Sequence, residues 1–380
     1  MAVLNATQNT QHTNSSAEKI QTDTANLIIG VVLLGSALIG CSLTLLVLGK
    51  DFFLGKNPPS VLVSALVWVD FIGAFSTAVL VFHGYVQGPE WIMYSPQCTL
   101  QGFFSTAFGI SSGAVVTFMS LERAVSLHKP FFYKQHATPC LARAFCIFIT
   151  LFCVTLSALP FAGVGRYMLS KSSRFVCQFD WFPEDLSGTV YILALGTSGA
   201  LLIFLMTASN IFVFVIVIRI RRQMSAVLPW GENARRHRRR GAFRLEERMA
   251  KFVALVSVVF LVTWLPVTIR LFCNVFRVYP SNGLDSLSLK LVVANFLLDP
   301  FTYVLFKKNF KRNLKQSITE LTEFIGDGSF SQRLKKQSSR NNSGNKKGNT
   351  SGVRHGQFAK TSMFQDDKPT MRTLNLDTAA

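Results

Sequence analysis

Seven long apolar runs constrain the fold of this chain more than any other feature of its sequence. Each run is about twenty residues or longer, which is the length that a helix needs to cross the hydrocarbon core of a bilayer. Because no water is available there to hydrogen-bond an open backbone, each run must form a helix. We therefore predict an all-α fold, a bundle of seven transmembrane helices. The runs cover residues about 27–48, 60–86, 100–122, 143–164, 188–218, 250–275 and 286–306.

The positions of the basic residues distinguish a membrane protein from a protein that binds nucleic acids. The formal net charge is +19 although only 16% of the residues are charged, and such a charge also occurs in proteins that bind nucleic acids. Here a seven-span chain places the basic segments on one side of the membrane, and the positive-inside rule makes that side cytoplasmic. We expect a multi-pass plasma-membrane protein with anionic membrane lipids near these segments and no nucleic acid as a partner. The segments are Lys50 with Lys56, His128–Lys134, Arg219–Lys251 and the tail from Lys307.

The N-terminal segment is expected outside the cell. Residues 1–26 are polar and lack the apolar core of a cleavable signal peptide. Asn5 and Asn14 each begin an Asn-x-Ser/Thr sequon. We therefore expect residues 1–26 to form a glycosylated extracellular N-terminus.

The segment after the seven spans is expected in the cytoplasm. The membrane domain covers 27–306, and Phe306 and Phe310 follow among lysines. This pattern predicts a short amphipathic eighth helix over 307–322 that lies on the inner membrane surface. Residues 323–380 are rich in Ser, Asn, Gly and Lys, cannot bury a core, and are expected to form a disordered cytoplasmic tail.

Charged side chains within the apolar runs mark the candidate functional positions. Glu122 and Arg123 end the third run and Cys98 precedes its other end, so about 25 residues, or roughly 37 Å of helix, separate them. Asp70 lies in the middle of the second run, where a lone carboxylate is costly unless it is paired or bound to an ion. An ionisable residue at membrane depth is a functional-site hypothesis by default.

Four motifs stand in the order and on the spans in which rhodopsin-like (class A) G-protein-coupled receptors carry them. They are Cys98, Glu122-Arg123, Trp264-x-Pro266 and Asp299-Pro300-x-x-Tyr303. The chain resembles this family over nearly all of residues 27–312. The resemblance implies a receptor, not an enzyme, that binds a ligand among its outer helix halves. It also implies activation of a heterotrimeric G protein inside the cell, with arrestin and receptor kinases as further partners.

The resemblance assigns a G-protein switch to eight residues. Arg123 would pair with Glu122 and, across the bundle, with Glu246 at the base of the sixth span, and release would let that helix swing outward. The alternative is that Glu246 only solvates the helix end. Trp264 is either a packing element or a toggle beneath the ligand, and Pro266 allows its helix to bend. The switch residues are Glu122, Arg123, Glu246, Trp264, Pro266, Asp299, Pro300 and Tyr303.

Two further sites follow from the same resemblance. Cys98 is expected to form a disulfide with Cys177, which would tie the second outer loop to the third span. The residues at the family's sodium-site positions bring two carboxylates together, which suits a small cation or one shared proton. The alternative is a hydrogen-bonded polar knot without sodium, and no other cofactor or metal is expected. The sodium-site residues are Asp70, Ser112, Asn295 and Asp299.

Within the family, the chain is most similar to the prostanoid receptors, and especially to the prostaglandin E branch. This branch binds acidic lipids that carry a carboxylate head and an apolar tail. The similarity rests on Ala158–Tyr167, Cys177–Trp181, Pro266–Asn274 and Leu298–Phe301.

Two residues stand where prostanoid receptors hold the carboxylate of the ligand. Lys290 replaces their arginine on the seventh span, and Tyr85 stands at their tyrosine atop the second span. A lysine offers a point charge rather than a planar fork, and it could instead snorkel outward or pair with Asp285. Arg270 is either a second anchor or an interfacial residue. The loop threonine of prostanoid receptors is missing from Lys171–Val176, where two positive charges appear instead.

The sequence therefore predicts a G-protein-coupled receptor for an acidic lipid of prostanoid type, and it hints at the stimulatory G protein and cyclic AMP. The alternative is an orphan receptor with ligand-independent constitutive signalling, because its carboxylate anchors are altered. A transporter or channel is disfavoured, since the sequence shows neither an inverted repeat nor a row of pore-lining charges.

Overall fold

The computed structural model describes most of the membrane domain. The described residues are 28, 30–48, 50–88, 96–170, 176–226, 233–306 and 319. The predicted glycosylation sites Asn5 and Asn14, the helix over 307–322 (apart from residue 319) and the tail over 323–380 lie outside them. Some side chains within described helices are also left out, among them those of Glu246, Pro300 and Tyr303.

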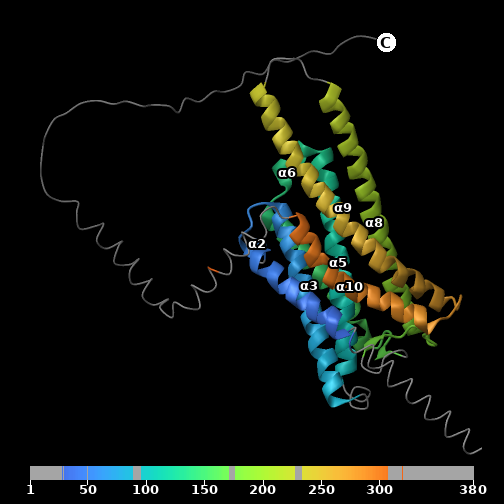
Figure 1. The fold of residues 1–380 in the computed structure, drawn as a ribbon. Helices are drawn as coiled ribbons and strands as arrows, with labels where there is room; N and C mark the ends of the chain where they lie inside the picture. The colour runs from blue at the N-terminus through green and yellow to red at the C-terminus, as the bar shows by residue number, and fades with distance from the viewer. Residues whose placement is uncertain are drawn as a thin grey trace, which may run out of the picture. The chain divides into compact units, whose positions relative to one another are not determined.

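Seven long helices make up the described membrane domain (Figure 1). Six spans in the described chain are long and apolar enough to cross a membrane. The seventh helix is α10 (Asn282–Phe306), 25 residues long, which carries Asp285, Lys290 and Asp299 among apolar residues. The predicted all-α bundle of seven helices is confirmed. The six spans are Gly30–Leu54, which ends in α2 (Lys50–Leu54), then Pro58–Gln87 (α3), Gln97–His128 (α5), Pro139–Ser157 (α7), Leu186–Gln223 within α8 (Leu186–Ala226), and Glu247–Val275 within α9 (Asn233–Val275).

Proline residues fix where several helices begin. Pro58 opens α3, Pro130 opens the short helix α6 (Pro130–His136), and Pro139 opens α7. A proline in the first helical turn loses no hydrogen bond there, and its fixed φ suits the helix. At α7, the Thr138 side chain also caps the helix by accepting a hydrogen bond from the Leu141 N–H at 3.2 Å.

A proline also explains why the fourth span ends earlier than predicted. The apolar run extends to residue 164, but α7 ends at Ser157 and the chain continues as the 3₁₀ helix η1 (Leu159–Ala162). Pro160 has no N–H to continue the α-helical ladder. Gly163 then reverses the chain with a φ of +84°.

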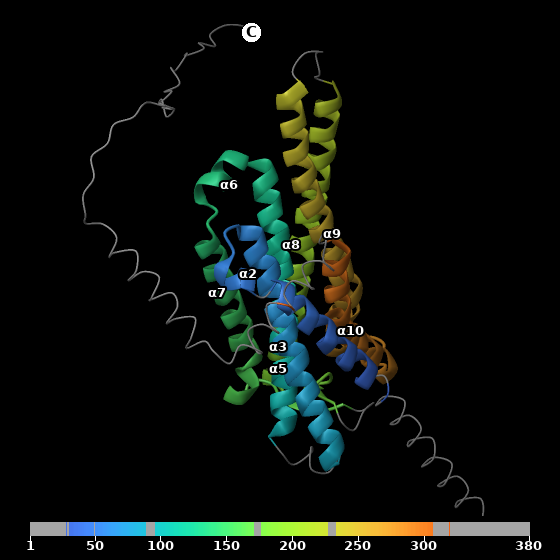
Figure 2. The ribbon, with the colours of Figure 1, turned by 60° about the vertical axis from the view of Figure 1, so that its left-hand side comes forward.

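A two-stranded hairpin lies at one end of the bundle, and α6 lies at the other (Figures 1 and 2). Strands β1 (Tyr167–Leu169) and β2 (Cys177–Phe179) pair antiparallel, with Tyr167 opposite Phe179 and Leu169 opposite Cys177. A disulfide joins Cys177 to Cys98 of α5, with their Cα atoms 5.2 Å apart. The predicted disulfide is confirmed, and it attaches β2 to the first turn of α5.

Tyr167 attaches the other strand of the hairpin to the bundle. Its hydroxyl donates to the Ser157 carbonyl at 2.8 Å and lies 2.7 Å from the Tyr191 hydroxyl. Burial raises the pKa of the Tyr167 phenol, so the hydroxyl stays protonated and can donate. Gly102 of α5 makes room for the ring, because a side chain there would overlap it.

Helix α5 is packed against four other long helices, namely α3, α7, α8 and α9, and it also contacts the short helix α6. Gly109 and Gly113, one turn apart on α5, face Trp264 and Phe260 of α9, whose rings stack with centroids 5.2 Å apart. A Cβ at Gly109 would lie 3.1 Å from the Trp264 ring, and one at Gly113 would overlap the Phe260 ring. The two glycines therefore let an aromatic pair approach the α5 backbone, as small residues do at membrane helix interfaces.

Replacing Gly113 by alanine should separate α5 from α9 and lower stability. Overpacking of this kind costs about 1–3 kcal/mol, and thermal unfolding of the detergent-solubilised protein measures it. The control is Gly35→Ala in the first span, where an added Cβ meets nothing within 4 Å. Equal unfolding temperatures for Gly113→Ala and the unchanged protein would contradict the contact between Phe260 and α5.

Candidate functional site

A buried ion pair lies on α5 at the α6 end of the bundle. Arg123 donates from Nε to Glu122 Oε2 and from Nη2 to Glu122 Oε1, each at 2.5 Å. The two side chains are 4% and 9% exposed, respectively. The Tyr133 hydroxyl of α6 also donates to Glu122. The structure thus pairs Glu122 with Arg123 as predicted, whereas the pairing with Glu246 stays a prediction because that side chain is not described.

A polar cluster about one turn from Arg123 joins three helices and was missed by the sequence analysis. The Asn210 amide of α8 donates to Ser120 of α5 at 3.2 Å and to Ser257 of α9 at 2.9 Å. The two serine hydroxyls lie 3.1 Å apart. The available signal was an asparagine inside an apolar run, because an amide in hydrocarbon needs partners on neighbouring helices.

The predicted sodium-site residues are all buried, and the structure brings them together in the middle of the bundle. Asp70 of α3 lies beside Ser112 of α5 and Asp299 of α10. The Asn295 amide donates to Asp299 Oδ2 at 2.9 Å, and the Thr263 hydroxyl donates to Asn295 Oδ1 at 3.2 Å.

Four oxygen atoms of this cluster have no hydrogen-bond partner among the described residues. They are both carboxylate oxygens of Asp70, the Ser112 hydroxyl and Asp299 Oδ1. A buried carboxylate without a partner is costly, and an oxygen-only donor set suits a hard cation such as sodium. The residues present therefore fit a small cation, and they equally fit one proton shared by the two carboxylates.

A largely apolar cavity of about 110 Å³ lies among the first span, α3, α5, α8, α9, α10 and the hairpin. Trp264 lines it, so the predicted toggle residue contacts the space that a ligand could occupy. Trp264 also stacks on Phe260, which packs against α5. The walls are mostly aliphatic and aromatic side chains, which is typical of a site for a small apolar molecule.

None of the three predicted ligand-binding residues is among the residues that line this cavity. On α10 the lining residues Leu289, Val292, Val293 and Phe296 follow helical spacing, and Lys290 is rotated by about 100° from Leu289 on the same helix. Lys290 is half-buried. Tyr85 packs against an apolar cluster that contains Val81.

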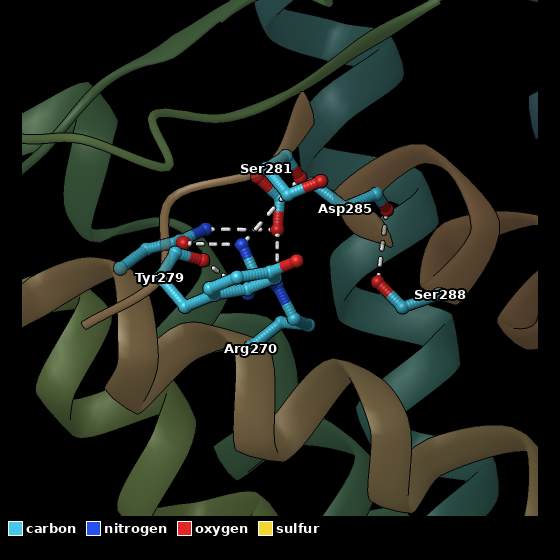
Figure 3. A network of polar contacts seen from close by, with 6 residues as sticks. Arg270, Tyr279, Ser281, Asp285 and Ser288 are labelled. Atoms are coloured by element: carbon cyan, nitrogen blue, oxygen red, sulfur yellow. Dashed lines mark hydrogen bonds and ion pairs between the residues drawn. The ribbon is translucent and has the colours of Figure 1, made fainter. Parts of the chain in front are cut away.

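Arg270 forms a buried ion pair with Asp285 that joins α9 to α10 (Figure 3). Arg270 Nε donates to Asp285 Oδ1 at 2.7 Å, and the side chains are 9% and 5% exposed. The other guanidinium nitrogens donate to the Tyr279 carbonyl at 2.9 Å and to Asn274 Oδ1 at 2.7 Å. The Asn274 amide donates to the same Asp285 oxygen at 3.0 Å.

This network pairs Arg270 within the protein, which favours a structural role. Its role as a second ligand anchor stays a prediction. Its nitrogens are occupied by one carboxylate, one amide and the α9–α10 turn, where Tyr279 has a φ of 54°. Asp285, which is one possible partner of Lys290 by sequence, forms an ion pair with Arg270 in the structure.

Fold and site together define a seven-helix membrane receptor. The family model described as "7 transmembrane receptor (rhodopsin family)" matches residues 40–303, and the chain belongs to this family, a class of receptors rather than enzymes. It is related to the prostanoid receptors. It is 27% identical to the prostacyclin receptor of Bos taurus over 290 residues, which are 74% of this chain and 72% of that receptor.

Two more comparisons agree with this placement. The chain is 26% identical to the prostaglandin E2 receptor EP2 subtype of Canis lupus familiaris over 260 residues, covering 65% of this chain and 70% of the relative. The solved structure of squid rhodopsin has the same fold, with a TM-score of 0.68 at 19% sequence identity, over 79% of this chain and 87% of that chain.

Replacing Asn210 by leucine should raise basal signalling. The substitution removes two hydrogen bonds that hold α9 against α5 and α8, together worth about 1 kcal/mol in a membrane, or roughly fivefold in a conformational equilibrium. Nucleotide exchange on a panel of Gα subunits, at matched surface levels, measures the effect. The control is Ser209→Ala, because the Ser209 hydroxyl bonds only its own helix, at Leu205. Unchanged basal exchange would show that this cluster does not control the position of α9.

Replacing Asp285 by asparagine should destabilise the receptor, because it leaves the buried Arg270 charge without a counter-charge. Breaking a buried pair in this way costs about 3–5 kcal/mol. The double variant Arg270→Met with Asp285→Leu should recover part of the loss, and Glu184→Gln at an exposed site is the control. Thermal unfolding measures all three variants. If Asp285→Asn were as stable as the unchanged receptor, this would contradict a stabilising role of the Arg270–Asp285 pair.

Proposed function

We propose that this receptor responds to an acidic lipid of prostanoid type and activates a heterotrimeric G protein. The observation that carries the proposal is the apolar cavity bounded by Trp264, because its walls suit a hydrocarbon chain. The names of the relatives, which are receptors for prostacyclin and prostaglandin E2, point to the same ligand class. The prostaglandin E likeness favours the stimulatory G protein and cyclic AMP.

The proposed switch runs from this cavity to the α6 end of the bundle. A ligand that displaces Trp264 also displaces Phe260, which is stacked on it and packed against Gly113. Movement of α9 would then release Arg123 from Glu122, and from Glu246 if that side chain pairs with it, for contact with the G protein. Pro266 lies inside α9 and interrupts its hydrogen-bond ladder.

Further parts of the proposed switch lie on α10 and in the middle of the bundle. Asp299, Pro300 and Tyr303 of α10 belong to the switch by family resemblance. A sodium ion would sit among Asp70, Ser112, Asn295 and Asp299, where it would neutralise the two buried carboxylates. Arrestin, receptor kinases and the outward-facing N-terminus remain part of the proposal.

We place the ligand's carboxylate at Lys290 rather than Arg270. Arg270 is occupied by Asp285, whereas Lys290 adjoins the cavity-lining residue Leu289 on α10. Tyr85 of α3 is the proposed second anchor. In this arrangement the apolar tail fills the cavity and the carboxylate stays at its edge.

A second candidate is ligand-independent signalling, and the Arg270–Asp285 pair favours it. Asp285 supplies from within the chain the carboxylate that a ligand would otherwise bring to Arg270. A receptor of this kind would signal in proportion to its expression and would not respond to any lipid.

Replacing Lys290 by glutamine should reduce the potency of carboxylate lipid agonists about tenfold or more. The reason is that losing a charge contact worth about 1.4 kcal/mol weakens binding tenfold. A panel of carboxylate lipids, with cyclic AMP and calcium read in parallel, identifies the agonist and gives the dose–response curves. Arg277→Gln, at an exposed position of the α9–α10 turn, is the matched control. An unchanged dose–response curve for Lys290→Gln would show that Lys290 does not bind the ligand's carboxylate.

A further inference from the structure

A small ion-pair network joins α8 to α9 at the α6 end of the bundle (Figures 1 and 2), and the proposed switch does not use it. Arg221 of α8 donates from Nη2 to Glu247 Oε1 of α9, and Lys251 Nζ lies 2.8 Å from the same oxygen. The Glu247 side chain is only 15% exposed, whereas both basic side chains are more than half exposed. One mostly buried carboxylate therefore pairs with a basic side chain from each of the two helices.

The two basic partners differ in what their contacts depend on. Lys251 lies four residues after Glu247 on α9, so the distance between them stays the same when this part of the helix moves as a rigid body. Arg221 belongs to α8, so its pair with Glu247 exists only while α9 lies close to α8. The contact with Arg221 is thus the one that restrains α9.

The two helices also differ in how easily they bend. Helix α8 has no proline between Leu186 and Ala226, whereas α9 contains Pro266. A proline is a common cause of a sharp bend in a helix. Glu247 precedes Pro266 by about 19 residues, or about 28 Å of helix, so a bend of about 10° at Pro266 would displace Glu247 by about 5 Å. A displacement of this size away from α8 would break the ion pair with Arg221.

Apolar packing holds the same parts of α8 and α9 together. Ala250 of α9 lies in a buried cluster with Val213 of α8 and Ala124 of α5, and Val217 of α8 packs against this cluster. The hydrophobic effect is non-directional, so packing of this kind does not by itself fix one position of α9. An ion pair requires a particular separation of two groups, and it can therefore select one of several packed positions.

We propose that Glu247 is a positioning residue for G-protein activation, because its pair with Arg221 holds the α6-end half of α9 against α8 in the resting receptor. The inference rests on the proposed function and deepens it, since it names a contact that breaks when α9 moves. It is distinct from the expected pair of Arg123 with Glu246, which would hold α9 to α5 instead of α8.

Basal nucleotide exchange on a panel of Gα subunits, at matched surface levels, tests the proposal. Arg221→Gln and Glu247→Gln should each raise basal exchange about two- to fivefold, which corresponds to about 0.5–1 kcal/mol in the resting equilibrium. The matched control is Lys251→Gln, which removes one positive charge from the same carboxylate but keeps the contact between the helices. It should leave basal exchange unchanged.

A charge exchange distinguishes positioning from a direct contact with the G protein. Arg221→Glu alone should raise basal exchange, and the double variant Arg221→Glu with Glu247→Arg should restore the resting rate because the attraction between the helices returns. A residue that only touches the G protein would not be rescued in this way.

A distance measurement on the purified receptor follows α9 without any G protein. Spin labels are attached to cysteines introduced at Gln223 of α8 and Arg248 of α9, which are both exposed, after the exposed Cys140 is replaced by serine. Glu247→Gln should shift the distribution of label distances toward longer values, and Lys251→Gln should not.

The outcomes separate this inference from the proposed function. With a Gα subunit that responds to the receptor, unchanged basal exchange in Glu247→Gln, equal effects of Arg221→Gln and Lys251→Gln, or no rescue by the exchanged pair would each overturn the positioning role. The receptor proposal would then stand. If Glu247→Gln lengthens the label distance but no Gα subunit responds to the receptor with or without lipid, the contact between α8 and α9 stands and the proposed function is wrong.

Discussion

Hydrocarbon cannot donate or accept a hydrogen bond, and the structure of this receptor follows from that limit. Most hydroxyl groups inside the bundle bond a carbonyl of their own helix, as Thr117 does at Gly113 and Thr302 does at Asp299. Polar groups that cannot do so bond across helices, as Asn210 does. Of the described polar atoms that do neither, most lie at two places, around Asp70 and in the cavity beside Trp264, and these are the places where we propose an ion and a ligand.

Helix α5 connects these places. Its first turn carries the disulfide, its middle carries Ser112 and the two glycines that face α9, and its last turns carry Ser120 and Arg123. A change at the cavity therefore has a continuous path of packed atoms along one helix to the α6 end of the bundle. Because the contacts between α5 and α9 involve rings against bare backbone, they favour discrete arrangements over gradual deformation.

Much of the fold could be predicted from the sequence, because span length, charge position and proline placement act locally. The seven spans and the disulfide are confirmed. The end of the fourth span was placed too late, because hydropathy alone does not show that Pro160 ends the helix, and α7 ends at Ser157. The partner of Arg270 could not be predicted. Which acid it meets depends on the rotation of α9 and α10 about their axes, and a shift of one residue rotates a side chain by about 100°.

The candidate site, like the fold, could be predicted from the sequence only in part. Motif positions such as Trp264 and Asp70 lie where the resemblance placed them, one beside the cavity and one beside Asp299. The polar contacts that link three helices, such as those of Asn210, were missed because each partner is an ordinary serine in its own segment. Only packing shows that they meet.

The hairpin is fastened to the bundle by two different kinds of chemistry. A covalent bond holds β2 to α5, whereas β1 depends on a phenol that reaches α7 and α8. A thiol reductant would cut the first attachment and leave the second intact. The hairpin, whose β2 residues line the cavity, would then stay attached to α7 and α8 at Tyr167 instead of detaching.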